Sequence, residues 1–375
     1  MSVTGNTSLR FSEEQAMLLD VARDFCRDRS PIATVREQLE SETGFDPALW
    51  QEMADLGWPG IALPEACGGA GLGIAGVVPV VESMGRAMLG TPLISSTLAG
   101  QLLLRAAGTG SQENVLAEIA AGVPATVALL ENGDWGDEGL ACTVDGDGVL
   151  HGTKQFVTDA GVAQIFIVSV EFEGAPALAV VRAEALGEGA IRPNTLIDRT
   201  RRAAAVEFDG AVVAEGSVVT GERVPAALRD LRLLGALLAA AEATGSAAAC
   251  LDTIVEYLKT RKQFGRLIGS YQALKHPAVD ILAGVDAARS FVYHAATLVG
   301  AGPLHRDAEI ACRMAKAQAT ETLAYAGDRA VQFHGGMGFT WECDAQLYIR
   351  RAQWSQQQFG DAQHHRKRLA SLLFD

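Results

Sequence analysis

The chain has 375 residues, of which 49% are hydrophobic and 20% charged, a composition typical of a globular protein with a sizeable core and unlike a disordered chain. At about 100–200 residues per domain, this length predicts two or three domains. The 31 Lys and Arg residues are outnumbered by 45 Asp and Glu residues, which gives a formal net charge of −14. Because so acidic a chain repels a phosphate backbone, we expect no nucleic-acid partner.

The six cysteines are scattered, and the closest pair, Cys312 and Cys343, is 31 residues apart. No CxxC or CxxH spacing occurs, which argues against a structural zinc site or a redox pair, and we assign no metal. The opening residues, MSVTGNTSLRFSEEQ, lack the basic and apolar regions of a signal peptide. Glu242 interrupts the apolar stretches 233–241 and 243–251, each far shorter than the roughly 18 residues of a membrane span. We therefore predict a cytoplasmic protein without a membrane span.

Residues 12–125 show the spacing of helices. Asp46-Pro47 predicts the start of a helix through Trp50 and Met53, since Pro suits the first helical turn. The segment 68-GGAGLG-73 interrupts this helical pattern. No GK[ST] follows it and no βαβ pattern surrounds it, so a connecting loop is favoured over a phosphate-binding loop.

From about residue 126 the pattern changes to short, β-branched or alternating runs separated by Gly, Asp or Pro. The runs are TVALLE, GVLHGTKQFVT, QIFIVSVEF, ALAVVRAE and AAVEFDGAVV. They predict closely spaced strands. Without helices between them, these strands indicate antiparallel pairing in a small barrel or sandwich rather than a Rossmann unit.

Helical periodicity returns from about residue 226 and continues to the end. The stretch 228–260 predicts one long helix, in which Ala239, Ala243, Gly245 and Ala247 permit a close helix contact. The chain therefore divides into a helical domain (1–125), a β domain (126–222) and a C-terminal four-helix bundle (223–375). Its predicted fold class is α+β.

In this order the segments resemble the acyl-CoA dehydrogenase family, and the resemblance runs nearly from end to end. It is strongest in 261-RKQFGRLIGSYQALKHPAVDI-281 and 331-VQFHGGMGFTWE-342, which match the family motifs RxxFGxxIxxxQ and QxxGGxG. Similar segments are 57-GWPGIALPEACGGAGLG-73, 150-LHGTKQFVTDAGVA-163 and 198-DRTR-201. The resemblance implies an FAD enzyme that removes hydride from the β-carbon of an acyl-CoA while a carboxylate takes the α-proton.

The resemblance also implies the residues that bind FAD. Phe156 and Thr158 lie two apart in a strand and so share a side, and they match positions beside the flavin ring. Arg261 matches a pyrophosphate contact made to the FAD of a neighbouring subunit. The remaining matched positions are Gln263, Phe264, Gln272, Gln332, Gly335, Gly336 and Gln363. A homo- or hetero-tetramer and an electron-transfer flavoprotein, or another electron acceptor, are the partners implied.

The sequence departs from the family where the chemistry takes place. The usual catalytic Glu corresponds here to Phe359, and a second family position for that Glu corresponds to Gly235. Neither residue can take a proton. The loop TEPxxGSD, which in the family covers the flavin and contacts substrate, corresponds to 130-LENGDWGDE-138, and only its Glu is kept. The motifs for FAD binding are thus retained while those for catalysis are not.

Four functional hypotheses remain open. The first is a complete acyl-CoA dehydrogenase with a relocated base, for which Glu242 and Asp361 are weak candidates. The second is a base-deficient partner subunit that completes the FAD site of a heterotetramer. The third is a flavoenzyme of other chemistry, such as an oxidase or desulfinase, and the fourth a purely structural protein.

The small residues Gly235, Ala236, Ala239 and Ala240 line one side of the long predicted helix. They predict a roomy cleft for a bulky acyl group, for example a ring system.

Overall fold

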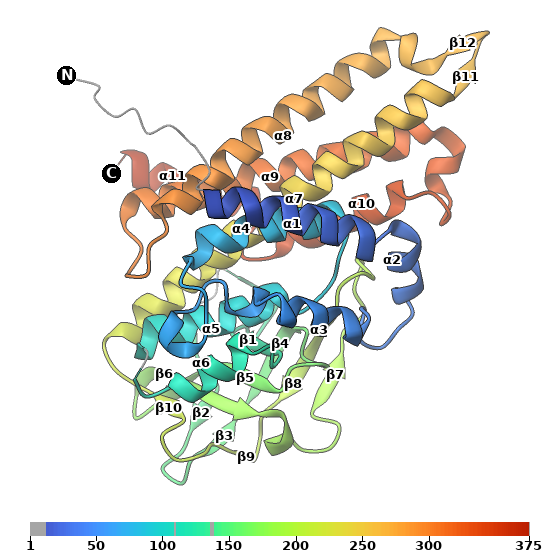
Figure 1. Ribbon diagram of the computed structural model, residues 1–375. Coiled ribbons are helices and arrows are strands. Elements are labelled where there is room, and N and C mark those ends of the chain that lie inside the picture. The colour runs from blue at the N-terminus through green and yellow to red at the C-terminus, as the bar shows by residue number, and fades with distance from the viewer. Residues whose placement is uncertain (1–12, 109, 136–138, 375) are drawn as a thin grey trace, which may run out of the picture.

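The computed structural model describes residues 13–108, 110–135 and 139–374. Helices come first, strands follow, and helices return, in the predicted order (Figure 1). The N-terminal helices are α1 (Glu13–Arg29), α2 (Ile32–Gln38), α3 (Pro47–Asp55), α4 (Gly73–Arg86), α5 (Leu93–Ala107) and α6 (Glu113–Ala120). Short 3-10 turns cover Trp58–Gly60 (η1) and Glu65–Cys67 (η2). As predicted, a helix starts at Asp46-Pro47, and Asp46 also caps it by accepting a 2.9 Å hydrogen bond from the backbone N–H of Ala48.

The strands form two sheets. They are β1 (Ala125–Ala128), β2 (Thr143–Val144), β3 (Val149–His151), β4 (Thr153–Thr158), β5 (Ile165–Phe172), β6 (Ala175–Arg182), β7 (Ile191–Pro193), β8 (Ala203–Glu207), β9 (Ala211–Val212) and β10 (Val218–Val219), with a 3-10 turn, η3 (Ala183–Ala185), after β6. The larger sheet has the order β10-β6-β5-β2-β3-β9, with β1 also paired to β5, and the smaller is β4-β8-β7.

Strand pairing is antiparallel as predicted, except at β5. Both β1 and β2 pair with β5 in parallel. The expectation of purely antiparallel pairing was wrong here, because the long connection from β1 to β5 leaves room for the chain to return in the same direction. No helix lies between these strands in the described residues, so the contrast with a Rossmann unit holds.

Strand β5 has both faces buried and so joins two cores. Ile165 and Ile167 pack into the large helical core, while Phe166 and Val168 pack into a second core inside the β region. This division follows from the period of two in a strand. Packing on both faces of β5 therefore holds the sheet firmly against the helices.

The C-terminal helices are α7 (Arg223–Thr260), α8 (Gln272–Leu298), α9 (Arg306–His334), α10 (Ala345–Gln357) and α11 (Ala362–Phe374). A hairpin of β11 (Lys262–Gln263) and β12 (Arg266–Leu267), followed by the 3-10 turn η4 (Ile268–Ser270), joins α7 to α8 at the end of the bundle remote from the sheets (Figure 1). A further 3-10 turn, η5 (Gly335–Phe339), follows α9. Helix α7 is apolar and long enough to cross a membrane, but its most apolar window is entirely buried. It serves as the central core helix.

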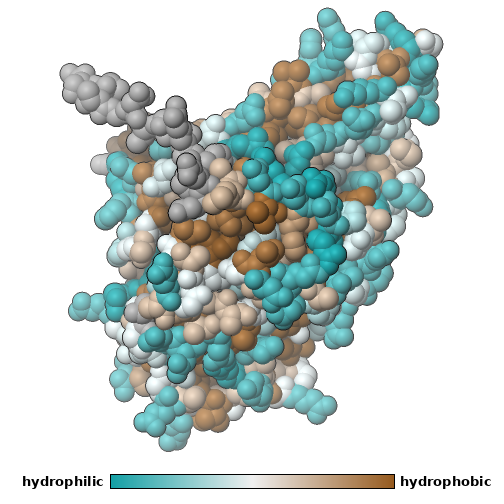
Figure 2. All heavy atoms as spheres, viewed as in Figure 1, coloured by the Kyte–Doolittle hydropathy of each residue, from teal (hydrophilic) through white to brown (hydrophobic). Residues whose placement is uncertain are grey.

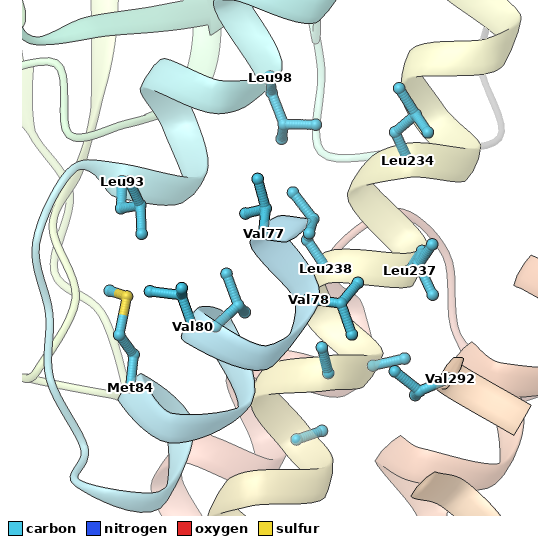
Figure 3. Packing of buried hydrophobic residues seen from close by; sticks show 14 of the residues in the cluster. Val77, Val78, Val80, Met84, Leu93, Leu98, Leu234, Leu237, Leu238 and Val292 are labelled. Carbon is cyan, nitrogen blue, oxygen red and sulfur yellow. The ribbon is translucent and has the colours of Figure 1, made fainter. Parts of the chain in front are cut away.

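The packing of α4 on α7 confirms the predicted close helix contact. Valines of α4 meet leucines of α7 in the core, with Leu93 and Leu98 of α5 beside them (Figure 3). A Cβ atom on Gly245 would overlap the carbonyl oxygen of Glu82, and one on Gly85 would overlap that of Glu242. The two backbones therefore approach as closely as glycine allows.

The loop at 68–73 has a structural role, as the sequence favoured. A Cβ atom on Gly69 would overlap the backbone oxygen of Leu63, so the glycine is required by packing within the loop. All six cysteines are buried free thiols. Within the described residues, no group of three or more His, Cys, Asp or Glu side chains is arranged to hold a metal.

Candidate active site

A cleft lies between the β region and helices α5, α7 and α10, and it has an inner and an outer part. The inner cavity has a volume of about 60 Å³ and the outer cavity about 460 Å³. The two parts share walls formed by Leu130, Trp135, Phe156, Trp354 and Gln358. The rest of the inner lining is mixed. Its apolar residues are Ile94, Leu98, Val127, Leu129, Ala239 and Phe359, and its polar residues are Ser95, Thr126, Gln155, Thr158, Asp159, Arg201 and Glu242.

A bulge in β4 presents Phe156 to this cleft. The pairing of β4 with β8 shifts between Lys154 and Val157, and Phe156 has a φ of 51° and is 40% exposed. The regular alternation assumed from the sequence is therefore interrupted. Phe156 and Thr158 nevertheless both line the inner cavity.

Glu131, the one residue that the sequence predicts to be kept from the family loop, is held by hydrogen bonds within the β region. Its carboxylate accepts hydrogen bonds from the ammonium of Lys154 (2.6 Å) and the backbone N–H groups of Cys142 (2.9 Å) and Ala141 (2.6 Å). Burial opposes ionisation, but these hydrogen bonds outweigh it and lower the pKa of Glu131. The loop is thus anchored to β4, which carries Phe156. Residues 136–138 of this loop lie outside the described residues.

The two positions without a base, Gly235 and Phe359, lie in contact. The Phe359 ring rests directly on Gly235, where a Cβ atom would overlap it, and packs against Trp135 with ring centroids 4.4 Å apart. The absence of a side chain at residue 235 therefore makes room for the ring at residue 359. The two residues predicted at the base positions are therefore complementary in size, since the ring of one occupies the space left by the other.

Buried cationic and imidazole groups fix the turn that carries Phe359. The Lys316 ammonium, on α9, donates to the carbonyls of Ser355 (2.9 Å) and Gly360 (2.8 Å), and burial lowers its pKa to about 7. The His365 ring lies 3.0 Å from the carbonyl oxygen of Phe359, and burial lowers the pKa of His365 to about 3. At neutral pH the His365 ring is therefore uncharged and holds the turn as a neutral donor.

Both candidate bases, Glu242 and Asp361, already interact with other groups of the protein. Glu242 lines the inner cavity but forms buried ion pairs with Arg201 and Arg351. Asp361 lines the outer cavity and is exposed, and its carboxylate accepts a 2.7 Å hydrogen bond from the backbone N–H of His364 at the start of α11.

The four small residues of α7 do not together line the cleft, as the sequence predicted, while a roomy cleft for a bulky acyl group stays a prediction. Of the four small residues, only Ala239 lines the inner cavity, while Ala236 and Ala240 are fully buried in the core. The space at Gly235 is taken by Phe359. Because a helix presents successive residues to different directions, the small residues do not form one wall.

The sequence did not indicate several polar residues of the inner cavity, among them Ser95, Thr126, Gln155, Asp159 and Arg201. Ser95 donates a 2.7 Å hydrogen bond to the Asp159 carboxylate. Asp159 directly follows Thr158 in the quoted β-domain motif, and Arg201 is the last residue of DRTR. These motifs were noticed, but nothing in their spacing showed that the two segments meet.

Asp159 makes the stability of the protein depend on pH. Burial raises its pKa from 3.8 to about 6, with the Ser95 hydrogen bond and the Arg201 charge acting against that rise. The folded protein thus holds this proton more tightly than the unfolded chain. The contribution of Asp159 to the free energy of unfolding therefore falls as pH rises from about 4 to 6, by up to about 3 kcal/mol.

Replacing Asp159 by Asn should remove this dependence while keeping an acceptor for Ser95. We expect Asp159→Asn to unfold at higher urea concentration than the unmodified protein at pH 8, and to show no such advantage at pH 3.5. Urea unfolding at both pH values measures the difference. An unchanged difference between the two proteins across this range would contradict the assignment.

The other predicted cofactor residues lie away from this cleft. Arg261, Gln263 and Phe264 belong to the β11–β12 hairpin or its start, and Gln332, Gly335 and Gly336 to the end of α9 and η5. Tyr257 of α7 stacks on His334 of α9, with ring centroids 4.2 Å apart, so both segments lie at one end of the bundle. Arg261, Gln263, Phe264, Gln272, Gln332, Gly335, Gly336 and Gln363 are all exposed, and none lines the inner or outer cavity.

Comparison with known proteins gives matches along nearly the whole chain. Residues 12–123 match the model of the acyl-CoA dehydrogenase N-terminal domain, and residues 228–374 that of the C-terminal domain. A curated relative, acyl-CoA dehydrogenase IpdE2 of Mycolicibacterium smegmatis, is 32% identical over 97% of this chain and 100% of its own.

Two solved structures are similar in fold and sequence. One, a variant of the Tcur3481-Tcur3483 steroid ACAD, has a TM-score of 0.83 and 30% identity, covering 96% of this chain and 98% of its own. The other, the ChsE4-ChsE5 complex from Mycobacterium tuberculosis, has a TM-score of 0.86 and 26% identity, covering 98% and 99%.

Proposed function

Because the chain belongs to the acyl-CoA dehydrogenase family of flavoprotein oxidoreductases, we propose that it acts in the α,β-dehydrogenation of an acyl-CoA thioester, with FAD as the hydride acceptor. The observation that carries the proposal is the cleft in which Phe156 and Thr158 line an inner cavity of mixed polarity beside a wider outer one. The apolar side chains of this lining suit an acyl chain, and its polar side chains can orient the bound group.

The residues present fit FAD in two separate places. A half-exposed Phe156 and the Thr158 hydroxyl suit the flavin ring. At the far end of the bundle, the exposed Arg261 guanidinium makes no hydrogen bond or ion pair within the described residues. Nearby, a Cβ atom on Gly335 or Gly336 would meet nothing within 4 Å, which leaves bare backbone for a phosphate. FAD, when bound, supplies the acceptor for the hydride.

Because these two places lie apart in one chain, we propose that Arg261 and its neighbours reach the FAD whose ring lies on another subunit. Arg261→Ala is then expected to weaken FAD retention, since losing a charged hydrogen bond costs about 1.5–3 kcal/mol. Equilibrium dialysis of FAD against the assembled protein measures the affinity. Arg266→Ala is a matched control, because the Arg266 guanidinium instead lies 4.2 Å over the ring of Tyr271. Equal FAD affinity in the Arg261 variant and the unmodified protein would refute this role.

Catalysis also needs a base, and the two usual positions provide none. Of the candidates, we propose Asp361 before Glu242 as the base of a chain that works alone. Asp361 lines the outer cavity beside Phe156 and accepts a hydrogen bond from only one backbone N–H. Glu242 is held by two guanidinium groups, which stabilise its charged form and weaken it as a base.

A second candidate function is that of a partner subunit without a base of its own. The specific observation in its favour is the contact of Phe359 with Gly235 and Trp135, which fills both usual base positions with one aromatic ring. Such a chain would contribute Arg261 and the Gln332–Gly336 segment to an FAD whose reacting groups belong to a homologous chain.

The assembly and the acceptor are proposed on the same grounds. Large apolar side chains stay exposed in the C-terminal region: Phe264, in the turn of the β11–β12 hairpin, is 91% exposed, and Phe339, in η5, is 80% exposed. Val279 and Leu282 of α8 are also exposed, and Figure 2 shows apolar surface over this helix. These suit a homo- or hetero-tetramer. We further propose an electron-transfer flavoprotein, or another acceptor, as the oxidant of the flavin, and a cytoplasmic location, which suits six free thiols.

Flavin bleaching distinguishes the two candidates. The chain, reconstituted alone with FAD, is mixed under anaerobic conditions with a panel of saturated acyl-CoA esters. Fast bleaching by the lone chain would exclude the partner-subunit role, and Asp361→Asn and Glu242→Gln variants would then identify the base. Bleaching that needs an added homologous chain with the catalytic Glu would exclude independent catalysis.

A further inference from the structure

The Phe359 ring stands between the inner cavity and a third cavity. The third cavity has a volume of about 670 Å³ and lies among α7, α9 and α11, with Pro225, Leu233, Arg313, Arg368 and Leu372 in its lining. Within the described residues, Trp135 and Phe359 belong to the linings of both cavities. Their rings pack on each other with centroids 4.4 Å apart. The two rings therefore form the wall between a space of about 60 Å³ and one of about 670 Å³.

The ring closes this wall against the backbone of α7. A Cβ atom on Gly235 would lie 2.3 Å from the nearest carbon of the Phe359 ring, which is closer than real Cβ atoms approach other heavy atoms. The gap between the ring and the helix is therefore too narrow even for a methyl group. While the ring is in place, no chain end passes along α7 from the inner cavity to the third cavity.

The backbone that carries the ring is fixed in an uncommon conformation. Phe359 has a φ of 57°, in the left-handed region that residues other than glycine seldom adopt, and Gly360 follows with a φ of 93°. The Phe359 carbonyl accepts a 3.0 Å hydrogen bond from the His365 ring, and the Gly360 carbonyl accepts a 2.8 Å hydrogen bond from the Lys316 ammonium. Such a strained conformation persists where the surrounding contacts hold it on several sides.

Contacts from α9 hold the His365 ring in turn. The Arg313 guanidinium lies 3.4 Å from Nδ1 of His365 and donates a 2.6 Å hydrogen bond to the Glu309 carboxylate. Since a guanidinium only donates, Nδ1 accepts, and Nε2 carries the proton that is donated to the Phe359 carbonyl. Helix α9 thus fixes the turn at two points, through Lys316 and through Arg313. The wall is therefore a rigid part of the fold rather than a lid.

We propose that Phe359 determines which acyl groups the inner cavity accepts: its ring keeps this cavity narrow, so that an unbranched chain end enters and a branched or cyclic end does not. Bulk in the acyl group then has to lie in the outer cavity of about 460 Å³. This inference rests on the proposed function, since it takes the inner cavity as the place for the end of the acyl chain.

The volume of the inner cavity explains this selection. About 60 Å³ holds about five water-sized atoms, at roughly 10–15 Å³ for each. A few methylenes in single file fit such a space, whereas a tert-butyl or cyclohexyl end needs more width at one level. Packed walls resist that insertion, because the extra carbon atoms force side chains and backbone out of place.

Matched acyl-CoA esters test the selection. Unbranched esters of six to ten carbons are compared with esters of the same chain length that end in a tert-butyl or a cyclohexyl group. Isothermal calorimetry with the FAD-reconstituted full chain gives the dissociation constants. We expect the unmodified protein to bind the unbranched ester about 10- to 100-fold more tightly than the branched one, a ratio that the size of a pocket can enforce.

Variants locate the selection at the ring. Phe359→Ala should remove the wall and join the inner and third cavities, so that the preference for the unbranched ester falls to about one. Phe359→Leu keeps part of the bulk and should give an intermediate preference. Leu372→Ala is the matched control, because Leu372 lines the third cavity but not the inner one. It should leave the preference unchanged.

A double-mutant cycle tests the wall without any ligand. Gly235→Ala should lower the melting temperature of the unmodified protein, because its methyl group would overlap the Phe359 ring. In the Phe359→Ala background the same substitution should cost little, since Ala suits a helix better than Gly. The melting curves of the four proteins also show that each is folded. Equal losses in the two backgrounds would overturn the wall.

Three results with the esters would overturn this role of Phe359: equal affinity of branched and unbranched esters for the unmodified protein, an unchanged preference in Phe359→Ala, or a preference that Leu372→Ala removes as well. Failure of every ester to bind, to the unmodified protein and to Phe359→Ala alike, would overturn the proposed function and this inference with it.

Discussion

Phe359→Glu is expected to raise the rate of flavin reduction by a saturated acyl-CoA ester about 10²–10⁴-fold, the usual effect of a positioned general base. The sequence predicts Phe359 at the position of the family's catalytic Glu, and Gly235 opposite leaves space that the ring fills. A Glu side chain is smaller than the ring and would project toward the same space beside Trp135. The rate of anaerobic bleaching, measured by stopped flow on the FAD-reconstituted chain, gives the comparison.

Phe359→Gln is the matched control, because it has the same shape and no basicity. Equal rates in the Glu and Gln variants would show that the base position alone does not limit the reaction. Gly235→Glu should not work in the same way, since its side chain would overlap the Phe359 ring. It is expected to lower stability without adding activity.

Arg351→Met is expected to have the largest effect on stability, lowering the free energy of unfolding by about 3–5 kcal/mol, as when one partner of a buried ion pair is removed. Arg351 is fully buried on α10. Its guanidinium donates to the carboxylates of Asp198 (2.5 Å) and Glu242 (3.1 Å). These contacts join α10 to α7 and to the segment before β8, so the loss would act on the cleft as a whole.

The unfolding free energy lost in Arg351→Met should depend on pH. Burial by itself raises the pKa of Asp198, but the charges of Arg351 and Arg201 and the hydrogen bonds from Thr200 and Arg351 together outweigh it and lower that pKa. In the unmodified protein Asp198 therefore adds stability above pH 4 that is lost as pH falls. Without Arg351 the buried carboxylate favours its proton. Urea unfolding should therefore show a larger deficit for Arg351→Met at pH 7 than at pH 4. The double variant Arg351→Met/Asp198→Asn should recover part of the lost unfolding free energy at pH 7. If it recovers none, the deficit does not come from the unpaired charge of Asp198.

The order of helices, strands and helices follows from the sequence alone, because the period of the apolar residues changes near residues 126 and 226. The helix start at Asp46-Pro47, the close contact at Gly245 and the family were likewise predicted from it. These features depend on residue types close together in the chain. The division into domains at 125 and 222, and the FAD contacts of Phe156, Thr158 and Arg261, stay predictions.

How distant residues meet became visible only in the folded protein. From the sequence, Phe359 and Gly235 are two separate predicted base positions, and nothing in it indicates that the Phe359 ring lies on Gly235 or that Ala236 and Ala240 point away from the cleft. Asp159 and Arg201 lie in two motifs of the sequence, but their shared place in the lining of the inner cavity is seen only in the fold. Each of these contacts joins segments from different elements. The packing of the whole core, rather than any local pattern, sets how those elements lie relative to one another.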